Sequence, residues 1–311
     1  KMINKNSKIF IAGHEGLVGS SVLRKFKSEQ FKNIYTIKKK KLNLLNQEKT
    51  YKYLKKVKPN LVVICAGRVG GINANQRMKS NFIYENLQIQ SNIIHGSYLA
   101  GVKNLINLGS SCIYPKKTRI PIKEEALLSS QLEETNDAYA VAKIAGLKMC
   151  QSYSENYDLN YKTLMPCNLY GSGDNYDLKK SHFYPALIRK IFTAKIQGKK
   201  KIEVWGTGLP KRELMHVDDV ANAIFFFMKK KFKESFLNIG SGKDYSINWY
   251  VKFIMKNLNV NLKIVRNRKM PDGTFRKLLD SSKAYRYGWK PKITLKEGFW
   301  KTFDSLKKDL S

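Results

Sequence analysis

A tyrosine and a lysine four residues apart, Tyr139 and Lys143, form the group best suited to acid–base chemistry. On a helix this spacing places both side chains on one face. The ammonium group of Lys143 can stabilise a phenolate at Tyr139 and so shift the tyrosine pKa from about 10 toward neutrality. Such a tyrosine exchanges a proton with a carbonyl or alcohol, as hydride transfer requires. Ser110, at the end of an apolar run, is placed to bond the same substrate oxygen.

Because such pairs also arise by chance, the elements that position them matter. An apolar run over residues 8–12 is followed at once by glycines in the spacing GxxGxxG, at Gly13, Gly16 and Gly19, and then by a helical stretch to about Gln30. The first glycine permits a tight turn, the second lets the backbone approach a pyrophosphate, and the third lets the helix pack closely on the strand. The helix N-terminus then receives the phosphates. The pattern predicts a dinucleotide site; a glycine-rich turn without a ligand is the alternative.

Beyond this loop, apolar runs alternate with helical stretches. Strands are expected at residues 33–37, 60–66, 103–108, 161–166, 201–205 and 235–239, and helices at 47–56, 81–99, 139–157, 183–194 and 217–230. This alternation predicts an α/β protein with a doubly wound parallel sheet of the Rossmann type. The pattern loosens after Gly171, where a Gly/Pro loop carries Lys211 and Arg212. We therefore expect a dinucleotide-binding domain over residues 7–170 and 213–242, and a smaller, discontinuous substrate-binding domain over 171–212 and 243–311.

A run of lysines at residues 38–41 follows the second strand, where dinucleotide-binding proteins contact the 2′ position of the cofactor ribose. NAD-binding proteins usually place an acidic residue there, whereas lysines favour the 2′-phosphate of NADP. Glu15, inside the glycine loop, would repel that phosphate, and the run is also compatible with a solvated loop. We expect NADP, and the choice between NADPH and NADH stays open.

Composition indicates an ordinary globular protein. The 311 residues are 42% hydrophobic, and no apolar run approaches the length of a membrane span. The N-terminal stretch has no apolar segment of the signal-peptide type. The four cysteines form no CxxC pair, so neither a metal site nor a disulfide framework is expected. These features favour a cytoplasmic protein without a membrane partner.

The formal net charge of +34 raises the possibility of a nucleic-acid partner. The lysines are spread along the whole chain, and no helix-turn-helix, zinc-finger or aromatic RNA-binding motif accompanies them. We therefore interpret the charge as a lysine-rich solvated surface and expect no nucleic-acid partner. Such a field would also steer anionic substrates such as nucleotides.

The glycine loop, the strand-end serine and the Tyr-Lys pair together resemble the extended short-chain dehydrogenase/reductase family. Blocks at residues 11–20, 69–75, 108–115, 139–146, 165–171, 212–219 and 271–280 resemble its GDP-L-fucose synthase group and cover nearly the whole chain. That group epimerises C3 and C5 of GDP-4-keto-6-deoxy-D-mannose and then reduces the C4 ketone with NADPH. The resemblance implies a GDP-sugar substrate and a homodimer.

Carried over position by position, the resemblance assigns roles to individual residues. The catalytic set is Ser110, Cys112, Tyr139, Lys143 and His182. The cofactor set is Gly13, Gly16, Leu17, Val18, Gly19, Lys39, Asn43, Leu44, Tyr139, Lys143, Pro166, Asn168, Leu169 and His182. The substrate set is Asn168, Lys190, Val204, Trp205, Arg212 and Lys277. The family commonly has arginine where Glu15 and Lys190 stand, and Lys190 keeps the charge without the bidentate geometry.

Cys112 and His182 are implied as the acid and base of the epimerisation, without assignment of either role. A lone cysteine is more often a small buried apolar residue, but Cys112 follows Ser110 by two residues at an edge where such sheets bind ligands. His182 is supported by its family position alone.

Parts of this pattern are compatible with other functions. A 4,6-dehydratase of the same family usually carries an Asp-Glu pair after its strand-end serine or threonine, and the Ser-Ser-Cys at residues 110–112 argues against it. A 4-epimerase retains its cofactor and needs no Cys/His pair. A non-catalytic dinucleotide sensor or nucleic-acid-binding protein would have no need for the intact set of Ser110, Tyr139 and Lys143.

Overall fold

Six parallel strands form the central sheet of this computed structural model, which describes residues 3–178, 181–270 and 272–310. Their spatial order is β2-β1-β3-β4-β5-β9. The strands are β1 (Lys8–Ala12), β2 (Asn33–Tyr35), β3 (Leu61–Ile64), β4 (Asn104–Leu108), β5 (Asn160–Pro166) and β9 (Phe236–Ile239). The order reverses between β1 and β3, which is the switch point where doubly wound sheets bind ligands at their carboxyl ends. The predicted sheet is confirmed.

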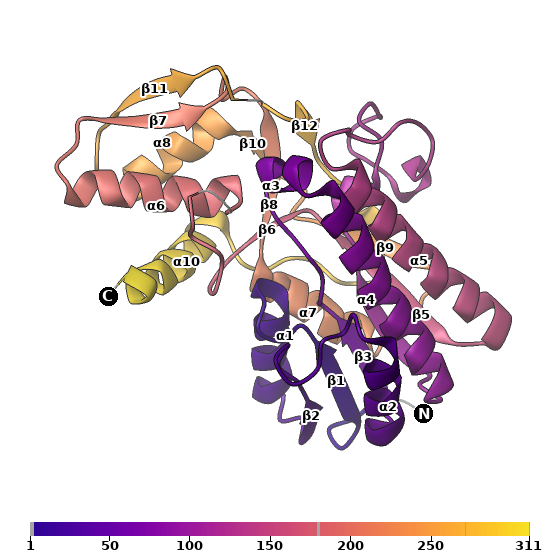
Figure 1. Cartoon of the computed structure of the whole chain (residues 1–311). Helices are drawn as coiled ribbons and strands as arrows, with labels where there is room; N and C mark the ends of the chain where they lie inside the picture. The colour runs from indigo at the N-terminus through magenta and orange to yellow at the C-terminus, as the bar shows by residue number, and fades with distance from the viewer. Residues whose placement is uncertain (1–2, 179–180, 271, 311) are drawn as a thin grey trace.

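Helices cover both faces of the sheet (Figure 1). One face carries α1 (Leu17–Ser28) and α7 (Val217–Phe227), and the other carries α2 (Gln47–Val57), α4 (Lys79–Leu99) and α5 (Asp137–Tyr157). Side chains of a strand point alternately to opposite faces, so Ile9 and Ile11 join one core while Phe10 and Ala12 join the other. Burial on both faces explains why these strands are continuous apolar runs.

A second packing unit, with its own core, lies beyond the carboxyl ends of the strands (Figure 1). It contains α6 (Phe183–Ile196), β7 (Lys201–Trp205), α8 (Ile247–Asn257), β11 (Lys263–Asn267) and α10 (Leu295–Leu310). A small sheet in the order β10 (Asp244–Ser246), β8 (Lys211–His216), β12 (Arg276–Lys277), with β6 (Asn168–Tyr170) also paired to β8, lies beside it. No helix in the described segments is long and apolar enough to cross a membrane.

Shorter elements complete the chain: α3 (Ile72–Arg77), α9 (Ser282–Arg286) and the 3₁₀ turns η1 (Ser111–Ile113) and η2 (Glu124–Ala126). Helix α9 packs against β9, and Ala284 and Trp289 join the core of the central sheet. This stretch therefore lies with the first unit, whereas α8 and α10 lie with the second. The division into two domains at the expected boundaries stays a prediction.

The prediction of a loop at Lys211 and Arg212 is wrong, because both residues belong to strand β8. The sequence Lys-Arg-Glu at the start of this strand resembles a solvated loop. Pairing with β6, β10 and β12 makes it a strand, since these neighbours satisfy its backbone groups. The helix expected to reach residue 230 ends at Phe227. Pro271, which begins one of the blocks that suggested the family, lies outside the described residues.

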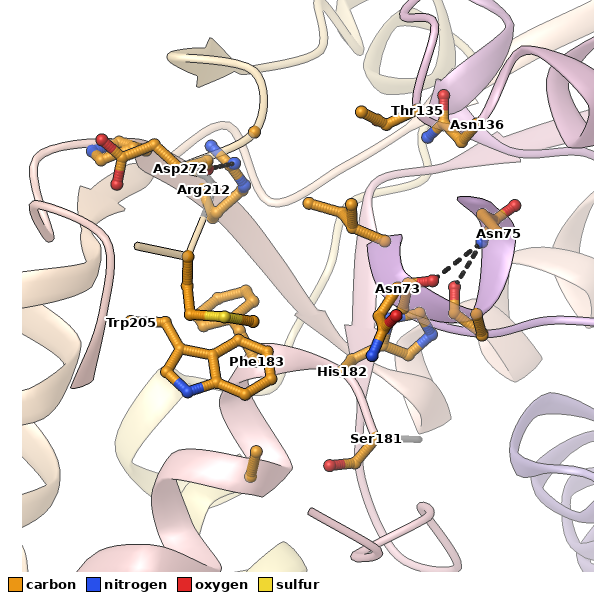
Figure 2. A pocket seen from close by; sticks show the side chains of 18 of the residues that line it. Asn73, Asn75, Thr135, Asn136, Ser181, His182, Phe183, Trp205, Arg212 and Asp272 are labelled. Carbon is orange, nitrogen blue, oxygen red and sulfur yellow. Dashed lines mark hydrogen bonds between the residues drawn. The ribbon is translucent and has the colours of Figure 1, made fainter. Parts of the chain in front are cut away.

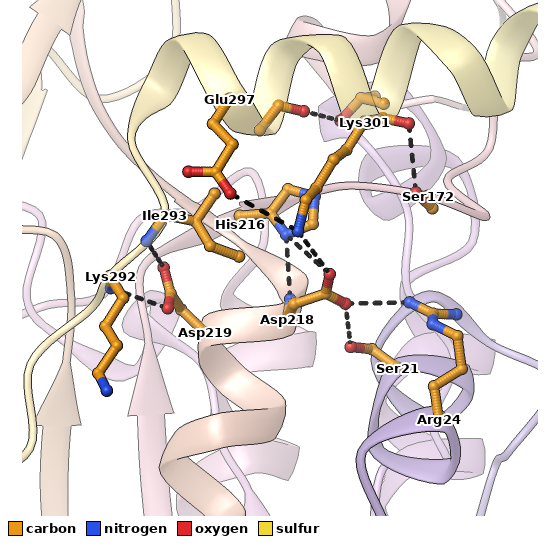
Figure 3. A network of polar contacts seen from close by, with 12 residues as sticks. Ser21, Arg24, Ser172, His216, Asp218, Asp219, Lys292, Ile293, Glu297 and Lys301 are labelled. Atoms are coloured by element: carbon orange, nitrogen blue, oxygen red, sulfur yellow. Dashed lines mark hydrogen bonds and ion pairs between the residues drawn. The ribbon is translucent and has the colours of Figure 1, made fainter. Parts of the chain in front are cut away.

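A polar network joins α1, α7 and α10 (Figure 3). The Asp218 carboxylate accepts hydrogen bonds from Ser21 Oγ at 2.6 Å and Arg24 Nη2 at 3.0 Å. Lys301 of α10 approaches the same carboxylate to 3.7 Å. His216, whose side chain is fully buried, accepts from the Asp218 backbone N–H at 3.2 Å. The network fixes the C-terminal helix against the helix that follows the glycine loop.

Candidate active site

The glycine loop forms a cradle at the switch point of the sheet. Gly13 has φ of +85°, and a Cβ there would lie 2.6 Å from the backbone nitrogen of Ala66. A Cβ at Gly19 would clash with the carbonyl oxygen of Gly13. Helix α1 begins at Leu17 behind Gly16, and no side chain of the described residues caps it. Its first N–H groups are therefore free to bind a pyrophosphate, and the cradle fits a dinucleotide.

The lysine run lies beside this cradle. Lys38 Nζ is 3.9 Å from Glu15 Oε1, and both side chains are exposed. The pair offsets the negative charge that Glu15 brings toward a 2′-phosphate. Lys39 is exposed in the turn after β2. The loop beyond it is anchored by Asn92, which donates to the carbonyl oxygen of Leu44 at 2.8 Å.

The serine, tyrosine and lysine singled out for proton chemistry meet at the carboxyl edge of the sheet. Ser110 is the N-terminal capping residue of η1, two residues after the end of β4, and its Oγ accepts from the Cys112 N–H at 3.3 Å. Tyr139 and Ser110 share a side-chain hydrogen bond. Lys143, one helical turn on, donates from Nζ to the Leu108 carbonyl oxygen at 3.0 Å and lies 5.8 Å from the Tyr139 ring centroid. The turn after β4 and helix α5 thus hold all three side chains.

Desolvation dominates the electrostatics of this group. It lowers the pKa of Lys143, which is only 5% exposed, to about 8. It raises the pKa of Tyr139, and Cys112 raises it further while the hydrogen bond with Ser110 opposes the change. The expected shift of Tyr139 toward neutrality is therefore not produced by the protein groups, because burial penalises the phenolate more than the hydrogen bond with Ser110 stabilises it.

A cavity of about 450 Å³ opens next to this group. It is lined by all six residues of the predicted substrate set and by both Cys112 and His182. Ser110, Tyr139 and Lys143 do not line it themselves but adjoin it through Cys112. Figure 2 shows Trp205 and Arg212 on one side of the cavity and Asn75, Thr135 and Asn136 on the other.

Cations and an aromatic ring gather on the first side. Arg212 of β8 and Lys277 of β12 are register partners on neighbouring parallel strands. Lys190 Nζ lies 5.1 Å from the ring centroid of Trp205, and that indole is 42% exposed. Desolvation lowers the pKa of Lys190, and it lowers the pKa of Arg212 as well. Cations that have already lost part of their hydration suit a diphosphate, and the exposed indole suits a flat base.

The opposite side carries the groups implied for proton transfer. Cys112 is partly exposed, and Asn136 Nδ2 donates to its Sγ at 3.2 Å. His182 directly precedes α6 and faces the cavity. Protein atoms around its ring lower the His182 pKa through desolvation, which keeps the imidazole neutral near pH 7 and able to accept a proton.

Several cavity residues were not identified from the sequence. They include the segment 70–77 with helix α3, together with Glu133, Asn136 and Asp272. Glu133 is buried, and its Oε2 accepts from Thr274 Oγ1 at 3.2 Å. One available signal was proximity, since residues 133–136 directly precede Tyr139. The other was the block at residues 69–75, which had suggested the family without a role for its members.

Comparisons with known proteins extend over nearly the whole chain. Residues 9–240 match the NAD dependent epimerase/dehydratase family. GDP-L-fucose synthase 1 of Arabidopsis thaliana is 44% identical over 303 residues, which cover 97% of this chain and 94% of that protein. The structure of a GDP-mannoheptose C4 reductase from Campylobacter jejuni with NADP bound has a TM-score of 0.90 at 35% identity, covering 98% of this chain and 99% of that chain. A GDP-L-fucose synthetase from Naegleria fowleri bound to NADP also has a TM-score of 0.90, at 25% identity, covering 100% of this chain and 95% of that chain.

Proposed function

Because the chain belongs to the NAD dependent epimerase/dehydratase family, and is similar to GDP-L-fucose synthases along its length, we propose that it makes GDP-L-fucose. It epimerises C3 and C5 of GDP-4-keto-6-deoxy-D-mannose and reduces the C4 ketone with NADPH. One observation carries this proposal. Cys112 and His182 line the same cavity as the cations Lys190, Arg212 and Lys277, so proton-transfer groups and a diphosphate site share one space.

The cofactor is held by the glycine cradle, the loop that carries Lys39, Asn43 and Leu44, and the segment after β5. NADPH, when bound, supplies the hydride for C4. The cradle supports this role because α1 has no side-chain cap among the described residues, and Gly13 and Gly19 allow a backbone turn that a Cβ would obstruct. The Glu15–Lys38 pair leaves the remaining lysines of the run to face a 2′-phosphate.

Epimerisation follows from the acidity of the protons beside the C4 carbonyl. A base removes the proton from C3 or C5, and the electron pair moves onto the C4 oxygen. Ser110 and Tyr139 donate hydrogen bonds to that oxygen and stabilise its charge. An acid on the opposite face then returns a proton to the carbon. Cys112 and His182 divide these roles, since a thiol and an imidazole both carry protons near neutral pH.

Reduction of the C4 ketone uses Tyr139 and Lys143. As hydride reaches C4, Tyr139 gives its proton to the C4 oxygen, and the buried cation of Lys143 stabilises the phenolate that remains. Arg212, Lys277 and Lys190 hold the diphosphate, and Trp205 packs against the base. The same bound sugar thus passes from the epimerisation to the reduction without leaving the cavity.

The assembly and location belong to the same proposal. Helices α4 and α5 pack together and expose apolar side chains, with Tyr84, Leu99, Val141 and Tyr157 each at least 42% exposed. A second copy of the chain would cover this face, giving a homodimer that light scattering would detect. Four free cysteines suit a reducing compartment, so we place the protein in the cytoplasm, which cell fractionation would test.

The decisive experiment supplies GDP-4-keto-6-deoxy-D-mannose with NADPH or NADH in D₂O. Stoichiometric cofactor oxidation, deuterium at C3 and C5, and GDP-L-fucose as product are the expected results. The structural likeness to a C4 reductase favours one alternative, reduction of a nucleotide sugar without epimerisation. Oxidation of NADPH without deuterium at C3 and C5 would support that alternative. Catalysis with a retained, unexchanged cofactor would instead indicate a 4-epimerase.

A further inference from the structure

Asn136 occupies the N-terminal capping position of α5 but does not cap the helix. Its backbone carbonyl accepts from the Ala140 N–H at 3.0 Å, as the position requires, while its side chain makes no capping hydrogen bond. The side chain turns toward η1 instead, and Nδ2 donates to Cys112 Sγ at 3.2 Å. The helix that carries Tyr139 and Lys143 thus begins with a residue whose amide contacts the cavity thiol.

Asn46 shows the usual behaviour of this residue type in the same chain. It caps α2, and its Oδ1 accepts from the Lys49 N–H at 2.9 Å. Asparagine is among the best capping residues because this hydrogen bond satisfies a free N–H of the first turn. The Asn136 side chain does not make that stabilising contact, which indicates that it is held by interactions elsewhere.

The carbonyl oxygen of the Asn136 side chain, Oδ1, indicates what else this residue contacts. Oδ1 is buried and has no hydrogen-bond partner in the described part of the chain, and the residue lines the cavity. A buried carbonyl oxygen without a partner is costly and is rarely left so. A hydroxyl of a molecule bound in the cavity would satisfy it.

We propose that Asn136 is a positioning residue that holds the Cys112 sulfur through Nδ2 and a sugar hydroxyl through Oδ1. This inference rests on the function proposed above. Of the two carbons to be epimerised, only C3 carries a hydroxyl, so the C3 hydroxyl is the group that Oδ1 accepts from. One amide then sets the sulfur and the reacting carbon at a fixed separation.

The proton balance explains why Nδ2 matters in either direction of transfer. When the sulfur takes the proton from carbon, an S–H bond forms, the C–H bond breaks and the electron pair moves to the C4 oxygen. When the sulfur gives a proton to carbon, a thiolate remains. The N–H donor stabilises the thiolate more than the thiol in both cases, because hydrogen bonds to charged groups are the stronger ones.

The first test needs no substrate. Iodoacetamide alkylation of Cys112 is followed by mass spectrometry against pH in the wild type, Asn136→Ala, Asn136→Asp and the matched control Asn46→Ala. We expect the rate of alkylation at a fixed pH to fall by about tenfold in Asn136→Ala, which is the size of one hydrogen bond to a charged group, and further in Asn136→Asp. Asn46→Ala should leave it unchanged. An unchanged value in both Asn136 variants would overturn the proposal.

The second test separates positioning from damage to the helix. With the keto sugar and NADPH in D₂O, Asn136→Ala should lose about tenfold in deuterium incorporation at C3 relative to hydride transfer. A frayed α5 would slow hydride transfer equally, because Tyr139 and Lys143 lie on it. The thermal midpoint should fall in Asn46→Ala and not in Asn136→Ala. An equal fall in both would show that Asn136 is an ordinary cap and would sink the proposal.

The two tests also distinguish this inference from the function on which it rests. If the wild type fails to turn over the keto sugar while the alkylation profile shifts as expected, the proposed function fails and the contact between Asn136 and Cys112 stands. If the wild type turns over and neither the profile nor the deuterium ratio changes, the function stands and the inference fails.

Discussion

Lys143 provides the sharpest test, because its burial sets a stability cost that the proposed chemistry requires. The fall of its pKa from 10.5 to about 8 corresponds to about 3 kcal/mol, at about 1.4 kcal/mol for each pKa unit. Lys143→Met removes the charge and keeps most of the volume, but it also removes the hydrogen bond to the Leu108 carbonyl, worth about 1 kcal/mol. We therefore expect the variant without cofactor to be more stable than the wild type by about 2 kcal/mol at pH 7, while reduction at C4 falls by about 10² or more.

The pH dependence of that difference follows from proton linkage. Below pH 8 the lysine carries its proton in both folded and unfolded states, and the full cost of burying the charge is present. Between pH 8 and 10.5 the unfolded state binds a proton that the folded state has released, so the wild type gains stability relative to the variant as pH rises. Other titrating groups are common to both proteins and cancel in the difference.

Urea unfolding at pH 7 and at pH 9.5, followed by tryptophan fluorescence without cofactor, measures this difference. We expect the advantage of Lys143→Met to shrink by at least 1 kcal/mol between the two values of pH. A variant less stable than the wild type at pH 7, or a difference that does not change with pH, would refute the reasoning that Lys143 is held as a desolvated cation.

Three further predictions concern the proton carriers, the cofactor loop and the polar network. Cys112→Ser and His182→Asn should each lower deuterium incorporation at C3 or C5 by about 10² to 10⁴, measured by mass spectrometry, and full incorporation in either would remove that residue from the epimerisation. Glu15→Ala should lower the KM for NADPH by about two- to fivefold, in line with one exposed charge, and leave that for NADH unchanged. Burial lowers the pKa of His216 to about 4, so as pH falls below 6.5 the unfolded state binds a proton that the folded state refuses. The protonation of His216 alone should therefore cost the wild type about 3 kcal/mol of stability between pH 6.5 and 4, and His216→Asn, which cannot take up the proton, should lose less in acid unfolding curves.

Much of the central sheet was predictable because each strand is buried on both faces. Such strands must be continuous apolar runs, and β1 was expected over the residues that form it. The glycine positions were equally informative, because Gly13 and Gly19 lie where any Cβ would meet backbone atoms. These are local requirements, and they can be recognised in a single sequence.

The second unit was less predictable because its strands depend on distant partners. Strand β8 begins with two cations and a glutamate, and it becomes a strand only through neighbours that enter the sheet from residues 168–170, 244–246 and 276–277. Helix α3 is six residues long and was not expected at all. Short elements of this kind carry too few residues for a periodic pattern to emerge.

The sequence by itself determined the fold class, the glycine turn and the spacing of the proposed catalytic residues, since these follow from spacing along one strand, turn or helix. Only the tertiary structure decided which distant groups share one cavity, and what burial does to them. Arg212 and Lys277 become neighbours through strand pairing, and Lys143 loses part of its proton affinity through desolvation. Asn136 would pass for an ordinary helix cap until its amide is seen to contact Cys112. The spacing of residues can be seen in the sequence, whereas the proximity of distant residues and their degree of desolvation depend on how the chain packs.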